Sequence, residues 1–300
     1  MSLGRIFDAP ATFFQQRQNS LPSLMERSQA VADIERVVVI GDSLAIGLGS
    51  VNIFDKNKNS TAYTTQRIEN LQPSTLPGPV FPRMFAKTLS RRLNKPVRWR
   101  SAGVDGGAVP DIRNFCLGVI KEEVENNRPP DCVVIICGIN DLKYFVSNPF
   151  SSDTPNDFRK NLLEMIMEIR SLCPSAKVVL PALPVQMIHK NSPLNVFPLS
   201  FFLDTLVGFW DSQKQLVAKI FPSHDVMYLG LTARDVKSWY PPIEEGEEDW
   251  NGSDNDEDDD GSLISADGVH PNGRCYARWA ELMAGRLLAT PVREPSMGKL

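Results

Sequence analysis

The sequence has few of the residues that hold metals or build disulfide frameworks. It contains five cysteines and three histidines in 300 residues. None of the cysteines has metal-ligand spacing with a histidine, and an odd number in so long a chain argues against a disulfide framework. We therefore expect buried, reduced cysteines in a reducing compartment.

Long apolar runs are also missing. The most apolar stretch, residues 197–210, is too short to span a bilayer and is interrupted by Asp204. The first residues lack the basic segment and apolar core of a secretory signal. These absences favour a soluble, cytoplasmic protein without a transmembrane segment. Arg5 and Arg17 stand among Ser and Gln residues, so organelle targeting stays open.

Glycine-rich nucleotide motifs are incomplete. There is no Walker-type lysine, and a dinucleotide fingerprint starting at Gly47 and Gly49 would need a third glycine where the chain has Asn52. The nucleophile elbow of the α/β-hydrolases would need a glycine where the chain has Ala45. We expect neither nucleotide binding nor a nucleic-acid partner.

Charge is distributed unevenly. The formal net charge is −4, yet residues 244–260 hold 11 of the 36 acidic residues. The other 25 acidic residues accompany 32 basic ones, so an acidic insertion interrupts a mildly basic body. We expect one domain over 34–290 with this insertion at 244–262, a polar leader at 1–33 and a tail at 291–300. Residues 52–80, rich in Asn, Thr, Gln and Pro, look like a further addition to the core.

The acidic stretch also fits a calcium loop. Asp256, Asp258 and Asp260 alternate, Gly261 is sixth, and Asp267 stands at the twelfth position. Flanking helices are not indicated, because prolines stand on both sides, at positions 241, 242 and 271. We therefore prefer a solvated acidic loop and expect no metal.

Strand and helix patterns alternate along the chain. Five short β-branched runs predict buried strands, namely Arg36–Ile40, Pro96–Arg100, Cys132–Cys137, Ala176–Leu180 and Val226–Leu231. Four segments with apolar residues three and four apart predict helices, at 80–93, 111–126, 157–172 and 273–288. This order predicts an α/β fold with a mainly parallel sheet covered on both faces.

Polar residues and glycines follow the predicted strands, where open parallel sheets bind ligands. "GDS" at 41–43 follows the first strand, "SAGVDGGAV" at 101–109 the second, and "GIND" at 138–141 the third. "ADGVHP" at 266–271 lies near the last predicted helix. Taken singly, each fragment has an ordinary interpretation, since serine and asparagine cap helices and glycines form turns.

Taken together, these fragments match the requirements of acyl transfer. A nucleophilic serine needs a base, and the base needs an orienting group, which Ser43, His270 and Asp267 would supply. An oxyanion needs preset donors. The N–H groups of Ser43 and Gly106 and the side-chain amide of Asn140 would supply those.

The sequence resembles the GDSL esterases and lipases of the SGNH-hydrolase superfamily. Four blocks occur in the order of that family: "GDSL" at 41–44, "SAGVDGG" at 101–107, "GIND" at 138–141 and "DGVHP" at 267–271. The resemblance implies a three-layer, flavodoxin-like α/β/α sandwich around a five-stranded sheet. It also implies serine-dependent hydrolysis of a small-molecule or lipid acyl ester, without a cofactor.

By position, the resemblance assigns each block a role. Ser43 corresponds to the nucleophile and first oxyanion donor, Gly106 to the second donor and Asn140 to the side-chain donor. His270 corresponds to the general base and Asp267 to its partner.

The second block departs from the family pattern. It often opens with asparagine, whereas this chain has Ser101, so the hydrogen bonds that brace the loop are expected to differ. The neighbouring Gly107 is the alternative to Gly106 as a donor.

The substrate is left open by these patterns. An esterase, lipase or lysophospholipase, a thioesterase and a carbohydrate O-deacetylase would all use the same residues, and a catalytically silent binding protein on this fold is the alternative from another class. Phe201 and Phe202, in an apolar stretch after the fourth strand, are candidates for the acyl pocket or for a core helix. The sequence does not indicate the oligomeric state.

Overall fold

A computed structural model describes residues 33–48, 62–66, 79–148, 154–184, 199–222, 224–239, 263–265 and 270–289, with the side chains of 62–66 and 199–204 left out. The predicted leader before Asp33, the acidic insertion and the tail lie outside the described residues, as does Asp267.

One sheet forms the centre of the molecule. Its strands are β1 (Arg36–Gly41), β2 (Ala62–Gln66), β3 (Arg98–Val104), β4 (Cys132–Ile136), β5 (Lys177–Pro181) and β6 (Val226–Leu229). They lie in the order β2-β3-β1-β4-β5-β6, and β3, β1, β4, β5 and β6 are parallel. Numbered along the chain, the parallel strands have the order 2-1-3-4-5 of a flavodoxin-like sheet. The predicted fold class and its five parallel strands are confirmed.

Two details of the sheet differ from the prediction. β2 adds a sixth strand, antiparallel to β3, from within the segment 52–80. β3 continues to Val104 rather than ending at Arg100, because residues 101–104 pair with β1 and β2. The loop after the second parallel strand is therefore short and begins at Asp105.

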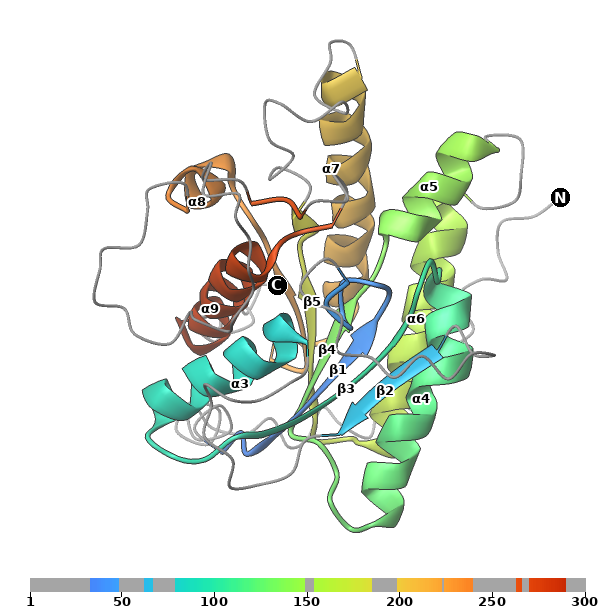
Figure 1. Cartoon of the computed structure of the whole chain (residues 1–300). Coiled ribbons are helices and arrows are strands. Elements are labelled where there is room, and N and C mark those ends of the chain that lie inside the picture. The colour runs from blue at the N-terminus through green and yellow to red at the C-terminus, as the bar shows by residue number, and fades with distance from the viewer. Residues whose placement is uncertain are drawn as a thin grey trace, which may run out of the picture.

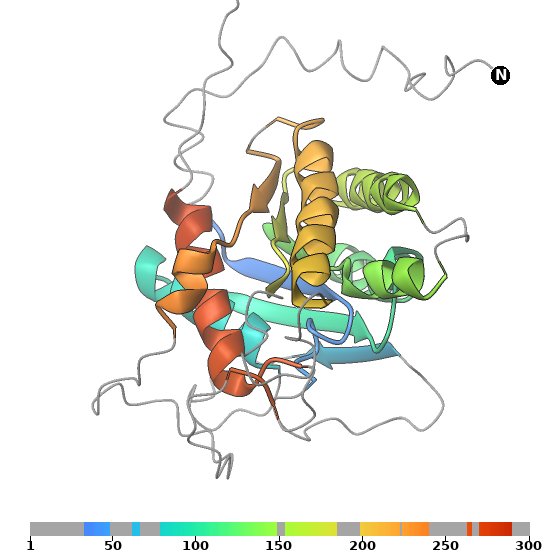
Figure 2. The same cartoon turned by 90° about the horizontal axis from the view of Figure 1, so that it is seen from above.

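Helices cover both faces of the sheet, giving three layers (Figures 1 and 2). One face carries α3 (Val80–Leu93), α8 (Ala233–Lys237) and α9 (Gly273–Ala289). The other carries α4 (Val109–Glu125), α5 (Ile139–Ser147), α6 (Pro155–Leu172) and α7 (Leu199–Ala218). No helix in the described ranges is long and apolar enough to cross a membrane.

The alternation of side chains in β1 explains the two apolar layers. Val37 and Val39 pack with α3 and α9, whereas Val38 and Ile40 pack with α4 and α6. Because both faces of β1 are buried, the strand has a continuous apolar sequence rather than an alternating one.

An aromatic contact joins α3 to α9 in the first of these layers. The rings of Phe81 and Trp279 have centroids 4.5 Å apart and are tilted by 55° to each other. Both side chains are fully buried, so this contact holds α9 firmly against the rest of the core.

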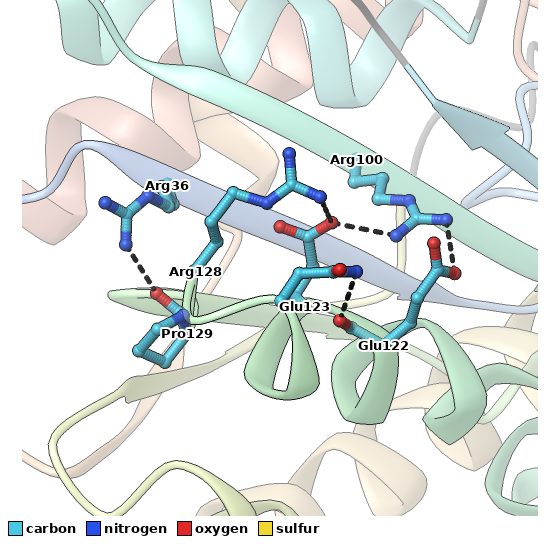
Figure 3. Close-up of polar contacts among 7 residues, drawn as sticks. Arg36, Arg100, Glu122, Glu123, Arg128 and Pro129 are labelled. Atoms are coloured by element: carbon cyan, nitrogen blue, oxygen red, sulfur yellow. Dashed lines mark hydrogen bonds and ion pairs between the residues drawn. The ribbon is translucent and has the colours of Figure 1, made fainter.

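An ion-pair network joins the beginning of β3 to the end of α4 (Figure 3). The guanidinium of Arg100 donates to Glu122 and to Glu123, each at 2.8 Å. Arg128 approaches Glu123 from the other side at 3.7 Å, as Figure 3 shows. Since α4 runs back along β3, this network lies at the end of the sheet opposite to the loop that begins at Asp105.

Candidate active site

The carboxyl end of β1 leads into a closely held turn that carries Ser43. A Cβ on Gly41 would overlap the carbonyl oxygen of Ile136, so β1 and β4 can approach here only because residue 41 is glycine. The N–H of Asp42 donates to that same oxygen at 3.1 Å. The N–H of Leu44 donates to Asp42 Oδ1 at 2.9 Å. These bonds fix the backbone on both sides of Ser43.

The side chain of Ser43 lies against His270. Ser43 Oγ and His270 Nε2 are 3.2 Å apart. Residues 43–48 form consecutive turns, so this described segment contains no helix for Ser43 to cap. A hydroxyl in this position can pass its proton to the imidazole when the Nε2 atom is unprotonated.

A small antiparallel bridge holds the segment that carries His270. The N–H of Ser265 donates to the carbonyl of His270 at 2.8 Å, and the N–H of Asn272 donates to the carbonyl of Leu263 at 3.0 Å. Asn272 also accepts from the N–H of Cys275 at 2.9 Å, near the beginning of α9. His270 is thus positioned both by this bridge and by the start of a buried helix.

Tyr276 links α9 directly to the turn of Ser43. Its side chain is fully buried, and its hydroxyl donates to the carbonyl of Leu48 at 2.9 Å. The N–H of Leu48 in turn donates to the carbonyl of Ser43 at 3.1 Å. The segments of Ser43 and His270 are therefore held together by more than the contact between the two side chains.

The loop after β3 contains two glycines whose N–H groups differ in their hydrogen bonding. The N–H of Gly107 donates to the carbonyl of Val104 at 3.0 Å, which closes a turn. Within the described ranges, the N–H groups of Gly106 and Ser43 have no hydrogen-bond partner. Of the two glycines considered from the sequence, Gly106 is the one whose N–H is available as a donor.

The first turn of α5 supplies a side-chain donor. Asn140 is buried, and its Nδ2 atom donates one hydrogen to the carbonyl of Gly107 at 3.2 Å. The amide carries a second hydrogen. Asp141 accepts from the N–H of Val109 at 3.1 Å through Oδ1, which ties the beginning of α5 to the beginning of α4.

Ser101 does not brace this loop. Its side chain is buried in β3, and its Oγ atom has no hydrogen-bond partner within the described residues. The loop is instead held from α5 by Asn140, Asp141 and Tyr144, whose hydroxyl donates to the carbonyl of Gly106 at 3.0 Å.

Two buried carboxyl groups lie next to the site. The pKa of Asp42 is raised to about 7, chiefly by burial and in smaller part by the nearby Asp141, while the hydrogen bond from Leu44 and the Lys214 ammonium oppose the shift. Burial likewise raises the pKa of Asp141 to about 6. Burying a neutral carboxyl costs less free energy than burying a carboxylate. Asp42 therefore keeps its proton up to a higher pH than an exposed aspartate does.

A buried ion pair, Lys214 with Asp211, lies near these two carboxyl groups. Lys214 is fully buried, and its Nζ atom lies 3.2 Å from Asp211 and 3.0 Å from the carbonyl of Pro181, to which it donates. Asp211 also accepts from the N–H of Leu183. The pair fixes α7 to the carboxyl end of β5, on the same edge of the sheet as Ser43.

Some predicted site residues fall outside the part of the chain that the structure describes. Asp267 and the calcium-loop residues 256–260 lie outside the described residues, and α7 includes Phe201 and Phe202 without a description of their side chains. Among the residues that are described, no group of three or more His, Cys, Asp or Glu side chains could hold a metal ion.

Two contacts of the site were not predicted from the sequence. Tyr144 stands four residues after Asn140 and therefore on the same face of α5, but this short helix was not predicted. Tyr276 lies in the helix predicted at 273–288, but its contact with the turn of Ser43 was not predicted.

Comparison with known proteins identifies the family. The model of the GDSL-like lipase/acylhydrolase family matches residues 39–278, which contain all four blocks. The chain belongs to this family. Membership in the GDSL-like lipase/acylhydrolase family supports carboxylic ester hydrolysis as the general activity. No curated protein sequence matches the chain.

Solved structures share the fold of this GDSL-like chain at low identity. The lipase Lip_vut3 from a goat rumen metagenome is 17% identical with a TM-score of 0.53, over 86% of this chain and 99% of that one. A Parabacteroides merdae protein described as a GDSL-like lipase is 14% identical with a TM-score of 0.50, over 84% and 95%. A family 2 carbohydrate esterase with a carbohydrate-binding domain, from Corynascus thermopiles (Myceliophthora fergusii), is 14% identical with a TM-score of 0.50, over 85% and 66%. At these identities the similarity shows the fold alone.

Proposed function

We propose that the protein is a serine esterase that cleaves carboxylic acyl esters through an acyl-enzyme intermediate on Ser43. The observation that carries the proposal is the distance of 3.2 Å between Ser43 Oγ and His270 Nε2. It gains support from the N–H groups of Ser43 and Gly106 and the amide of Asn140, which all lie at the same edge of the sheet.

The first half of the reaction acylates the enzyme. Ser43 Oγ attacks the carbonyl carbon of the ester while His270 Nε2 takes the hydroxyl proton. The electron pair of the carbonyl bond moves to oxygen and gives a tetrahedral oxyanion. We assign its stabilisation to the N–H groups of Ser43 and Gly106 and to the second hydrogen of Asn140 Nδ2.

The second half releases the acid. The tetrahedral species collapses, the bond to the alkoxy group breaks, and the protonated His270 gives its proton to the departing alcohol. A water molecule then loses a proton to His270 and attacks the acyl carbon. A second tetrahedral oxyanion forms in the same place. As it collapses, the bond from the acyl carbon to Ser43 Oγ breaks, the protonated His270 returns its proton to Oγ, and the carboxylic acid leaves.

In this mechanism Asp267 would accept a hydrogen bond from His270 Nδ1. Such a bond keeps the proton on Nδ1, so that Nε2 faces Ser43 as an acceptor, and it stabilises the imidazolium that forms. The spacing of three residues between Asp267 and His270 carries this part of the proposal.

We assign the substrate to the acyl esters handled by esterases, lipases or lysophospholipases, with Phe201 and Phe202 of α7 lining the acyl pocket. Hydrolysis of p-nitrophenyl esters from acetyl to palmitoyl, beside a lysophospholipid, an acyl thioester and an acetylated sugar, measures the preference directly. Phe202→Ala should shift the preferred chain length. An unchanged preference with lowered stability would mean that this side chain belongs to the core.

A fluorophosphonate tests the mechanism, because only a serine with a base and oxyanion donors attacks it quickly. Mass spectrometry of the folded protein should show a single adduct, on Ser43, and Ser43→Ala should abolish it. Ser171→Ala is the matched control, since its hydroxyl is bonded to the carbonyl of Glu168 within α6 and should play no part. An adduct on another serine, or none with the fold intact, would favour a binding protein over a hydrolase.

A further inference from the structure

Side-chain packing contributes little to the position of Gly106. Its φ angle is +69°, in the left-handed region that favours glycine, and apart from its two chain neighbours no described residue lies within 4 Å of the position that a Cβ would take. Glycine also has the widest choice of backbone angles. Hydrogen bonds within and to this turn are therefore what restricts the direction of its N–H.

Two hydrogen bonds hold the peptide group between Gly106 and Gly107. At its nitrogen end, the N–H of Gly107 donates to the carbonyl of Val104 at 3.0 Å, within the turn itself. At its oxygen end, the carbonyl of Gly106 accepts from the hydroxyl of Tyr144 at 3.0 Å. In the described part of the chain, Tyr144 makes the side-chain hydrogen bond to Gly106 that comes from outside the turn.

Tyr144 belongs to the same helix face as the proposed side-chain donor. Asn140 lies one helical turn earlier in α5 and donates to the carbonyl of Gly107, the next carbonyl along the chain. α5 begins three residues after β4 ends, and Asp141 in its first turn accepts from the N–H of Val109, which ties α5 to α4. The two side chains thus hold two successive carbonyls of the loop against a helix that is itself anchored.

We propose that Tyr144 is a positioning residue of the oxyanion site. Its hydroxyl and the bond from Gly107 to Val104 together hold the turn of residues 104–107, and so aim the Gly106 N–H, which lies in the central peptide of this turn, at the developing oxyanion. The inference rests on the proposed esterase function. Without the hydroxyl, the turn and its Gly106 N–H sample other orientations, and the donor must be ordered again in each turnover. This cost falls on the tetrahedral states and not on the bound ester.

Tyr144→Phe is a clean test because it removes only the hydroxyl, and the side chain is 44% exposed, so the fold does not depend on it. We expect kcat for a p-nitrophenyl ester to fall about 3- to 10-fold, as the loss of one neutral hydrogen bond predicts. The KM should stay within about twofold and the melting temperature nearly unchanged.

A trifluoromethyl ketone gives a readout that a merely structural role would not move. Ser43 Oγ adds to its carbonyl carbon, His270 takes the proton, and the carbonyl oxygen becomes an oxyanion that needs the same donors. Its Ki should rise in Tyr144→Phe by the factor that kcat loses, whereas product inhibition by the carboxylic acid should be unchanged.

Ser171→Ala is the control. It removes an exposed hydroxyl that, like that of Tyr144, donates to a backbone carbonyl, here that of Glu168 within α6, and it should leave kcat and Ki unaltered. Tyr144→Leu removes the aromatic ring as well as the hydroxyl, whereas Tyr144→Phe keeps the ring. If the Leu variant has a lower kcat and the Phe variant does not, the ring is what matters and the inference is wrong.

The wild-type protein separates the two proposals. A wild type that hydrolyses no ester and takes no label on Ser43 contradicts the esterase function and, with it, the role of Tyr144. A wild type that hydrolyses esters beside a Tyr144→Phe variant with unchanged kcat and Ki contradicts the role of Tyr144 alone.

Discussion

His270 Nε2 lies 3.2 Å from Ser43 Oγ, although the two residues are 227 positions apart in the chain. Ser43 follows the first strand of the sheet, and His270 precedes α9. The packing of α9 on α3 and the bond from Tyr276 to Leu48 bring these distant segments to one edge of the sheet.

The contact predicts that the serine and histidine act as a unit. His270→Ala should slow fluorophosphonate labelling of Ser43 almost as fully as Ser43→Ala abolishes it, because the hydroxyl then has no base. Asp267→Asn should be milder, since His270 can still take the proton with poorer orientation. Labelling rates by mass spectrometry measure both effects. Rapid labelling of the His270→Ala protein would exclude His270 as the base.

Asn140→Ala should lower kcat by about 10²–10³-fold, the usual cost of removing one donor to an oxyanion. The KM should change little, since the bound ester does not yet carry the charge. The variant also loses the bond to the carbonyl of Gly107, so its effect should exceed that of Tyr144→Phe. Steady-state kinetics measure kcat and KM separately. A change confined to KM would show that Asn140 binds the substrate and does not stabilise the oxyanion.

Asp42→Asn should change how stability depends on pH. The pKa of Asp42 is raised from 3.8 to about 7, so the folded state keeps a proton that the unfolded chain releases between these values. Stability therefore falls as pH rises through this window, by about 1.4 kcal/mol per pH unit at most, and is level above it. The raised pKa of Asp141 lowers stability in the same way as pH rises from about 4 to about 6.

Asparagine does not titrate, so the free energy of unfolding of the variant should fall less steeply than that of the wild type from pH 4 to 7. Relative to the wild type, the variant should therefore be more stable at pH 8 than it is at pH 4. Urea unfolding at several pH values measures the two curves. Parallel curves for the two proteins would show that Asp42 is ionised throughout.

Arg100→Met should destabilise the fold without affecting catalysis. It leaves the carboxylate of Glu123, 12% exposed, with only the longer contact to Arg128 among its described ion pairs, and should cost about 1–3 kcal/mol. Arg36→Met, which loses one bond at 3.3 Å to the carbonyl of Pro129, is the milder control (Figure 3). Urea unfolding and kcat are the measurements. A large fall in kcat at unchanged stability would contradict this structural role.

The strands and long helices could be predicted because their local patterns agree with their environment. Val37–Ile40 is apolar throughout since both faces are covered, and α3 begins and ends where its periodicity does. The extension of β3 was missed, because Ser101 and Gly103 have low strand propensity and are held in the sheet by pairing with β1 on one side and β2 on the other. Tertiary contacts, which the sequence does not display, decide such positions.

Those parts of the candidate site could be predicted in which the type of residue itself indicates its chemical role. Ser43, Asn140 and His270 carry reactive groups in recognisable blocks, and the structure brings them to one edge of the sheet. Tyr144 and Tyr276 act through hydroxyl groups on backbone carbonyls, and such a partner depends on how two elements pack. The pKa of Asp42 was hidden for the same reason, since burial sets it.

Because α9 follows β1 at a long distance in the chain, synthesis of α9 is a condition for chemistry. Ser43 leaves the ribosome long before His270, and a nascent chain without residues 263–289 has the nucleophile but not the base. Such a chain also leaves Phe81 on α3 without Trp279, so an apolar surface stays open to chaperones and proteases. Translation products that stop before α9 would then be inert and readily degraded, and the appearance of esterase activity would report that α9 has docked.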